Sequence, residues 1–288
     1  MSLTSSYRGR IAPSPSGFLH IGHARTFMTA YERAQAAGGD LILRVEDLDA
    51  ARCKPAYYDA MIEDLEWLGI RWTEGPDLSG PRQPYLQSAR GAFYTSAWHS
   101  LMDSGLIYPS PHSRRDVEHA LSAPHEGAGD LVFPVEFRPA RVERADSPGA
   151  VNWRFRVPDG LSVRFSDLRA GEQSFVAGRD FGDFIIWSKD GWPSYEMAVV
   201  VDDFTMGVSE VVRGEDLLLS TARQLLLYRA LGWAAPAFYH CPLVRDAEGI
   251  RLAKRTVGLT IRELRDKGLK PAEVLAMAEK HQPQISAD

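Results

Sequence analysis

The stretch from Arg10 to His23, Arg-Ile-Ala-Pro-Ser-Pro-Ser-Gly-Phe-Leu-His-Ile-Gly-His, most restricts the folds open to this chain. A strand is predicted to end at Ala12, because the prolines that follow cannot continue a β-ladder. Gly17 lets the resulting loop pass close to a ligand. A helix is then predicted to begin near Ile21, where apolar residues recur at helical spacing, and to end at the glycine pair 38–39. The stretch therefore predicts a strand, a loop and a helix in immediate succession.

Two histidines mark the start of that helix. His20 and His23 are three residues apart, so they share one face of the helix at its N-terminus. A helix N-terminus offers backbone N–H groups and the positive end of the helix dipole, which together make a natural phosphate site. Two imidazoles can donate further hydrogen bonds there, and the small Gly22 leaves room for a flat base. The alternative, a helix cap with two surface histidines, does not account for the strand and loop that come before it.

Composition narrows the class of protein. The chain has 288 residues, 44% hydrophobic and 25% charged, which is ordinary for a soluble globular protein of one large domain or two modest ones. No apolar run approaches the roughly 20 residues of a membrane span, and no secretory segment follows Met1, so we expect a cytoplasmic protein without a membrane partner. Cys53 and Cys241 are too far apart in sequence to suggest a disulfide framework. A net charge of -5 argues against a general DNA coater but allows a tRNA on a local basic face.

The first hundred residues follow the pattern of an open α/β sheet. Leu41–Val45 is a nearly all-apolar run typical of a buried parallel strand. It is followed by the acidic segment 46–49, and carboxylates just past a strand end lie where such sheets bind ligands. An acidic turn that caps the next helix is the alternative. Helices are predicted from Pro55 to Leu68 and from about Ser88 to Asp103, so this part is typical of half a doubly wound sheet.

The pattern changes at about Tyr108, where prolines become frequent and strand-like alternation follows. Tyr195–Asp203 is apolar and then doubly acidic, and its periodicity leaves strand and helix equally open. The remaining elements are expected as strands near 151–157, 161–165, 184–187 and 210–213, a helix over 221–231, a hairpin-like turn at 246–249 and two short helices near the end.

Two motifs carry a resemblance to a known family. His20-Ile-Gly-His23 resembles the HIGH signature of class I aminoacyl-tRNA synthetases, and Arg10-x-Ala-Pro-Ser-Pro-Ser-Gly resembles the glutamyl subgroup in particular. Arg251-Leu-Ala-Lys254-Arg255 resembles the KMSKS loop of the same family, although alone it would be taken for solvated surface. It departs from that pattern with Arg251, Ala253 and Arg255, but it keeps Lys254, the lysine that contacts ATP in the family. The resemblance covers most of the chain, to about residue 256.

The resemblance implies adenylate formation, in which a carboxylate attacks the α-phosphate of ATP and pyrophosphate leaves. The protein must then hold two reactants in line and stabilise charge on the phosphates, usually with Mg²⁺. The ATP-binding residues implied by the motifs are His20, Gly22, His23 and Lys254. The implied catalytic residues are His20, His23, Lys254 and Arg255.

A glutamate substrate has two carboxylates and one ammonium group, so its selection requires cationic partners and an anion. In the family, arginines contact the carboxylates and a glutamate contacts the amino group. The alternatives are a salt bridge from Arg213 to Glu215 or Asp216, and a plain core role for Tyr195. Matching the motifs residue by residue implies that L-glutamate is bound by Arg10, Ser14, Glu46, Tyr195 and Arg213.

The length of the chain favours a shortened paralogue of the glutamyl enzymes, because the segment after Arg255 is too short for their helical anticodon-binding region. That paralogue activates glutamate without tRNA and esterifies it to queuosine in the anticodon of tRNA(Asp). We therefore expect ATP-dependent activation of L-glutamate and its transfer to queuosine-34 by a monomer that receives the anticodon loop. The alternatives left open are a minimal glutamyl-tRNA synthetase that charges a tRNA 3′ end, a small-molecule nucleotidyltransferase and a non-catalytic tRNA-binding paralogue.

The expected fold is α/β, with a Rossmann-like class I synthetase catalytic domain in residues 1–107 and 191–236. A small α+β subdomain is expected as an insertion over 108–190. The C-terminal part, 237–288, is expected to hold the KMSKS-like loop and short helices, with no anticodon-binding domain.

The insertion departs from the family in its metal ligands. Many members of the paralogue family hold zinc there, through Cys-x-Cys after a Tyr and a later Tyr-x-x-x-Cys. Here Tyr108 is followed by Pro-Ser-Pro, and the later segment runs from Phe133 to Phe137 without a cysteine. His112, His119 and His125 lack ligand spacing and are expected on the surface, so we expect no structural zinc.

Overall fold

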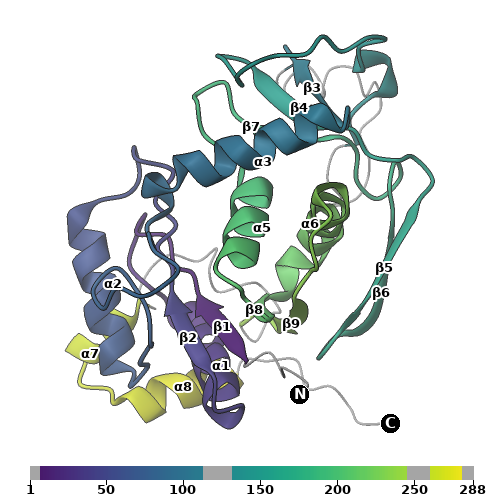
Figure 1. The fold of residues 1–288 in the computed structure, drawn as a ribbon. Helices are drawn as coiled ribbons and strands as arrows, with labels where there is room; N and C mark the ends of the chain where they lie inside the picture. Colours follow the sequence, from purple (N-terminus) through teal and green to yellow (C-terminus); the bar gives the residue numbers. More distant parts are fainter. Residues whose placement is uncertain (1–6, 113–131, 245–259, 281–288) are drawn as a thin grey trace, which may run out of the picture. The chain divides into compact units, whose positions relative to one another are not determined.

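In a computed structural model of the protein, the residues described are 7–112, 132–244 and 260–280 (Figure 1). They form two compact units. The first combines the described parts of 1–89, 206–217 and 236–288, and the second combines those of 90–205 and 218–235. The units divide the chain by compactness, whereas the domains expected from the sequence follow the family pattern. Those domain boundaries remain a prediction.

The first unit is built on parallel strands. Two parallel strand pairs form its sheets, and Ser209 N donates to Arg8 O over 2.9 Å while the Arg10 side chain reaches Val212 O, so the second pair lies beside the first. The carboxyl ends of neighbouring strands therefore lie at one edge, where open parallel sheets bind ligands. The pairs are β1 (Arg8–Ile11) with β2 (Asp40–Leu43), and β8 (Glu210–Gly214) with β9 (Ala237–Cys241).

Helices pack against this sheet through one apolar core. Ile21, Ala24 and Phe27 of the first helix are buried in it together with strand residues, as the helical spacing predicted. Gly38, just past that helix, has φ +59°, a left-handed conformation that glycine adopts without strain. Figure 1 shows the last helix, in yellow, running beside the first. The helices are α1 (Ile21–Ala36), α2 (Pro55–Trp67), α7 (Ile261–Asp266) and α8 (Pro271–Lys280), with 3₁₀ turns η1 (Gln87–Ala89) and η3 (Glu215–Leu217).

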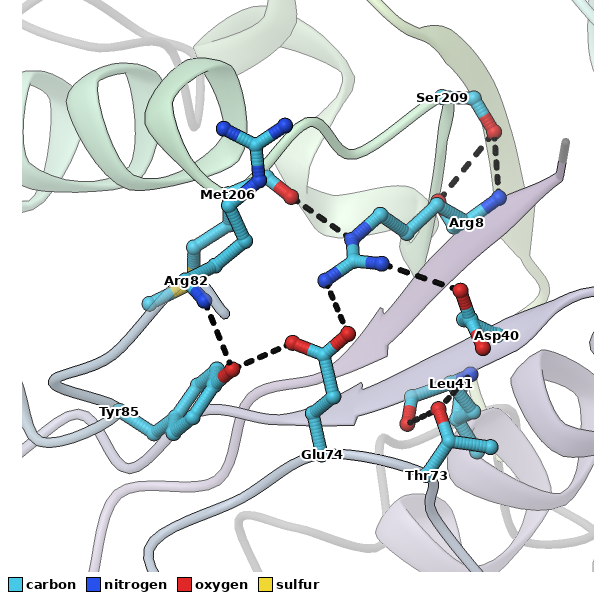
Figure 2. Close-up of polar contacts among 9 residues, drawn as sticks. All are labelled: Arg8, Asp40, Leu41, Thr73, Glu74, Arg82, Tyr85, Met206 and Ser209. Carbon is cyan, nitrogen blue, oxygen red and sulfur yellow. Dashed lines mark hydrogen bonds and ion pairs between the residues drawn. The ribbon is translucent and has the colours of Figure 1, made fainter. Parts of the chain in front are cut away.

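A polar cluster anchors the start of β1 (Figure 2). The Arg8 guanidinium donates to Asp40 Oδ2 over 3.0 Å, to Met206 O over 2.8 Å and to Glu74. Tyr85 donates its hydroxyl to the other carboxylate oxygen of Glu74, and burial together with this bond raises the pKa of Tyr85 to about 12. The cluster fixes the end of β1 that is opposite to the ligand-binding edge.

The second unit combines helices with antiparallel strands. Its strands form an antiparallel sheet in the order β3-β4-β7 and a separate antiparallel hairpin, β5-β6. Strands near 151–157, 161–165 and 184–187 were expected, and the structure confirms them. The elements are α3 (Gly91–Asp103), β3 (Ile107–Ser110), η2 (Val135–Phe137), β4 (Asn152–Phe155), β5 (Ser162–Asp167), β6 (Gly171–Val176), β7 (Phe184–Trp187), α5 (Tyr195–Thr205) and α6 (Leu218–Leu231).

The segment whose periodicity was ambiguous is the helix α5. Its residues Glu196 to Asp203 are all buried, including the two aspartates, so no exposed face was available to reveal a helical period. Asp202 is bonded by Arg90 Nε at 2.6 Å and by the Tyr94 hydroxyl at 3.0 Å, which ties α5 to α3. Two helix starts differ slightly from the prediction: α3 begins at Gly91 after the turn η1, and α6 begins at Leu218.

Asp183 is the centre of a buried polar cluster in the segment expected as an insertion. Its carboxylate accepts hydrogen bonds from Arg138, from Val157 N at 2.8 Å and from the Tyr108 hydroxyl. Burial and Asp183 raise the pKa of Tyr108 well above its usual range. Arg138 also pairs with Asp159, so one arginine joins two carboxylates. This part of the chain is therefore held by charge-assisted hydrogen bonds as well as by apolar contacts.

Candidate active site

The helix α1 begins with a reciprocal histidine cap. His20 is the N-cap residue, and its Nδ1 accepts a hydrogen bond from Gly22 N at 3.1 Å. His23 Nδ1 accepts in turn from His20 N at 3.2 Å. The two rings stack with centroids 3.7 Å apart. This is the arrangement of a capping box, with imidazoles in place of the usual hydroxyl and carboxylate.

The cap determines which ring nitrogens carry protons. In a neutral imidazole one nitrogen donates and the other accepts, and in both rings Nδ1 is the acceptor. The proton therefore lies on Nε2 in His20 and in His23. Both side chains are partly exposed at the helix start, and each has a ring N–H donor at Nε2. Such donors suit phosphate oxygens.

The cap also changes one expectation. The sequence predicted that open backbone N–H groups would form the phosphate site, but Gly22 N is bonded to the His20 ring, and His23 N is bonded to His20 O at 2.9 Å. A Cβ at Gly22 would lie 3.1 Å from His20 Cε1. A side chain at position 22 would therefore crowd the His20 ring, and the predicted role of Gly22 beside a flat base stays a prediction.

Two buried arginines lie on neighbouring strands of the first unit. Arg10 on β1 and Arg213 on β8 are each 4% exposed. Arg10 Nη1 donates to Val212 O over 2.9 Å, so Arg10 is bonded to the peptide that leads into Arg213. Two buried guanidinium groups therefore belong to adjacent strands, with Arg10 near the carboxyl end of β1 and Arg213 near that of β8. Arginine is the side chain best shaped to bind a carboxylate there.

His240 is a contact of this site that sequence reasoning missed. Arg213 and His240 are partners in the parallel register of β8 and β9, and Arg213 Nε donates to His240 Nε2 over 3.2 Å. His240 has no exposed surface. The Arg213 guanidinium also lies 5.5 Å from the ring centroid of Phe238. The one signal in the sequence was a polar residue near the end of an otherwise apolar strand.

Glu46 is held against the signature loop. Its backbone N donates to Pro13 O over 3.0 Å, and its carboxylate pairs with the fully buried Arg44 at 3.1 Å. Ser14 is exposed in the same loop. The signature loop and the acidic segment therefore meet beyond the carboxyl ends of β1 and β2, and the binding role of these residues stays a prediction.

The structure does not relate three further predicted site residues to this group. Tyr195 is the first residue of α5 in the second unit and is 40% exposed. Lys254 and Arg255 lie outside the described residues, as does the turn predicted at 246–249. The roles of these three side chains stay predictions.

Neither a metal-binding cluster nor a disulfide is present among the residues that the structure describes. Within 7–112, 132–244 and 260–280, no group of three or more His, Cys, Asp or Glu side chains could hold a metal ion. Cys53 and Cys241, both of which the structure describes, are not joined by a disulfide, as expected. No helix in the described part of the chain has the length and apolarity needed to cross a bilayer.

Comparison with known proteins places the chain in a family. Residues 6–281 match the family model of the catalytic domain of class I tRNA synthetases (E and Q). A glutamyl-Q tRNA(Asp) synthetase of Symbiobacterium thermophilum is 45% identical over 276 residues, which make up 93% of this chain and 84% of that protein. Glutamate--tRNA ligase 1 of Syntrophomonas wolfei is 39% identical over 93% of this chain, but only 54% of the ligase is covered.

A solved structure agrees. The crystal structure of a glutamate tRNA ligase from Elizabethkingia meningosepticum in complex with its amino acid matches with a TM-score of 0.75 and 30% identity, over 92% of this chain and 54% of that one. The chain thus spans about half the length of these ligases, and its fold is the mixed α/β catalytic domain of a class I synthetase. The chain belongs to the class I tRNA synthetases of the glutamate and glutamine group and, within them, to the glutamyl-Q tRNA(Asp) synthetases.

Proposed function

We propose that this protein uses ATP to activate L-glutamate and transfers the glutamyl group to queuosine-34 in the anticodon of tRNA(Asp). The observation that carries this proposal is the 45% identity to a glutamyl-Q tRNA(Asp) synthetase over 93% of the chain. The residues of the first unit support it, because they supply phosphate donors and carboxylate-binding arginines at one edge of a parallel sheet.

In the activation step, a carboxylate oxygen of glutamate attacks the α-phosphorus of ATP. The bond from that phosphorus to the bridging oxygen breaks, and pyrophosphate leaves with the electron pair. The Nε2–H groups of His20 and His23 donate to phosphate oxygens, which stabilises the charge that develops there. Lys254 and Arg255 neutralise the β- and γ-phosphates. A Mg²⁺ ion would be held largely by the phosphate oxygens of ATP and by water, and would supply further neutralisation of the phosphate charge.

Recognition of glutamate uses charge complementarity. Arg10 and Arg213 contact the two carboxylates, and Glu46 contacts the ammonium group. Ser14 and Tyr195 complete the site as polar and shape-reading contacts. Each guanidinium forms charge-assisted hydrogen bonds to a carboxylate, so a substrate with one carboxylate fewer makes fewer of these strong contacts.

In the transfer step, a hydroxyl of the queuosine cyclopentene-diol attacks the carbonyl carbon of glutamyl-adenylate. An ester forms, AMP leaves with the electron pair, and the hydroxyl proton is released. Queuosine lies in a single-stranded loop, and bases in such loops can be turned outward to reach a protein. One compact enzyme can therefore perform both steps.

The proposed arrangement is a Rossmann-like catalytic domain over 1–107 and 191–236, an insertion over 108–190 and a C-terminal part over 237–288. A monomer satisfies it, because every proposed site residue belongs to one chain.

The test of activation is glutamate-dependent ATP–pyrophosphate exchange without tRNA. We expect exchange with glutamate and a rate lower by roughly 10³-fold with glutamine, because a neutral amide replaces the carboxylate that the site is proposed to bind through an arginine. Comparable exchange with glutamine or aspartate would contradict the assignment of the substrate. Exchange that requires tRNA would contradict activation as a separate first step.

A further inference from the structure

The orientation of Arg213 depends on its neighbour in the sheet. Arg213 and His240 are opposite each other in the register of β8 and β9, and the bond from Arg213 Nε to His240 Nε2 is 3.2 Å long. Both side chains are buried, Arg213 at 4% exposure and His240 at 0%. Phe238 lies two residues earlier on the same face of β9, and its ring stacks near that of His240 with centroids 6.2 Å apart. An imidazole and a phenyl ring thus flank one guanidinium.

The direction of this hydrogen bond follows from the chemistry of its two partners. Arginine donates through all five of its N–H groups and accepts none. His240 Nε2 must therefore be the acceptor, so this imidazole is neutral and carries its proton on Nδ1. A protonated His240 would place a second positive charge against Arg213 in a buried position, where both charges lack water.

We infer that His240 is a positioning residue for glutamate recognition. It holds the Nε edge of Arg213, which fixes the plane of the guanidinium before a carboxylate arrives. A side chain fixed in this way loses less conformational freedom when the substrate binds. The inference rests on the proposed function, in which Arg213 contacts a carboxylate of glutamate. It adds a residue that lies in neither signature motif.

Substitutions at position 240 can remove or keep the hydrogen-bond acceptor that faces Arg213. His240→Phe and His240→Met lack an acceptor but fill a similar volume, whereas His240→Gln offers a carbonyl oxygen near the position of Nε2. Tyr239→Phe is the matched control, because it removes one polar atom from the adjacent position of β9, on the opposite face. Each variant is measured by pyrophosphate exchange, for the KM of glutamate, the KM of ATP and kcat, and by its thermal unfolding.

A positioning role predicts a selective effect. His240→Phe and His240→Met should raise the KM for glutamate about 10-fold, the effect of weakening one charged hydrogen bond, with the KM for ATP within twofold of wild type. His240→Gln should recover most of that loss, and Tyr239→Phe should match wild type. In an Arg213→Ala background, His240→Phe should cause no further rise, because the side chain that it orients is gone.

Other results would overturn the inference. A KM for glutamate within twofold of wild type in His240→Phe and His240→Met would do so, and so would an equal rise in the KM for ATP. If His240→Gln is as impaired as His240→Phe, His240 has only a packing role. Absence of glutamate-dependent exchange in the wild type would contradict the proposed function itself, which separates the two failures.

Discussion

The two signature histidines perform two tasks with different ring nitrogens. The Nδ1 atoms of His20 and His23 accept backbone hydrogen bonds and so stabilise the start of α1. The Nε2–H groups are the ones that we propose donate hydrogen bonds to the ATP phosphates. Because the tasks belong to different atoms, one substitution can separate stability from catalysis.

That substitution is His20→Asn. Asparagine is among the best N-cap residues, so the free energy of unfolding should stay close to that of wild type. Asparagine has no donor at the Nε2 position, so the rate of pyrophosphate exchange should fall about 10²-fold, as for loss of one preorganised donor.

Urea unfolding and the exchange assay measure the two effects on the same protein. His20→Ala is the control, because it lacks both functions and should also lose about 1 kcal/mol of stability. If His20→Asn keeps exchange within twofold of wild type, His20 is only a cap.

Single residues were predictable where a local motif carried them and not where pairing across strands did. Arg10 and Glu46 could be placed from the loop and the strand end that contain them. His240 could not, because its partner Arg213 is 27 residues away and only the register of β8 and β9 brings them together. A helix cap formed by the histidines was considered only as the alternative to a phosphate site, and its reciprocal form was not predicted, since histidine is not a usual N-cap residue.

At the scale of elements, the contact between α2 and α7 combines burial with charge. Arg262 at the start of α7 pairs with Glu63 at 2.8 Å and lies 3.7 Å from the Asp64 carboxylate. Asp64 is fully buried, and its two oxygens accept no hydrogen bond from the residues described. Burial raises the pKa of Asp64 from 3.8 to about 6. Ile261 N also donates to Leu19 O over 2.8 Å, so the same helix supports the signature loop.

This raised pKa predicts how stability changes with pH. Below pH 3.8 the carboxyl is protonated in both folded and unfolded chains, so its ionisation has no effect. Between pH 3.8 and about 6 the folded state retains a proton that the unfolded state releases, so stability falls as pH rises. Asp64→Asn removes this effect, and its gain over wild type should be about 2 kcal/mol larger at pH 8 than at pH 4.5.

Urea unfolding at the two pH values measures this difference. Glu63→Gln is the matched control, because it removes the exposed carboxylate partner of the same arginine, and its effect should be small at both pH values. Equal effects of Asp64→Asn at pH 4.5 and pH 8 would contradict the raised pKa, because they would mean that the attraction of Arg262 balances the burial of the carboxylate.

Elements with one apolar face were predictable, and an element buried on all sides was not. The starts of α1 and α2 and the glycines that follow them agree with helical spacing and turn chemistry. The sequence of α5 shows no helical spacing of apolar and polar residues, because its residues Glu196 to Asp203 are all buried. Its acidic end is compensated by Arg90, more than a hundred residues earlier in the chain.

At the scale of the whole molecule, the segment expected as an insertion has its own means of support. Phe133, Trp153 and Phe155 are each at most 3% exposed. The hydrogen bonds of Asp183 add a charged centre to this apolar packing. These contacts need no metal ligand.

We therefore predict that purified, tag-free protein contains no stoichiometric zinc and that a strong chelator leaves its midpoint of thermal unfolding unchanged. A structural zinc would stabilise the folded state by several kcal/mol, so its removal would clearly lower the midpoint of thermal unfolding. Elemental analysis is the direct measurement. One zinc per chain would show that His or carboxylate ligands complete a site that the sequence did not reveal.

The central claim concerns the acceptor, and glutamate transfer to tRNA tests it most directly. Labelled glutamate is offered with ATP to tRNA(Asp) that contains queuosine, to tRNA(Asp) without it and to tRNA(Glu), with the 3′ CCA removed from a portion of each. Truncation is preferable to periodate treatment, because periodate also attacks the cyclopentene-diol. We predict labelling of queuosine-containing tRNA(Asp) with and without its CCA, and of no other substrate. Labelling that is lost on truncation, or labelling of tRNA(Glu), would contradict the claim and identify a tRNA 3′ end as the acceptor.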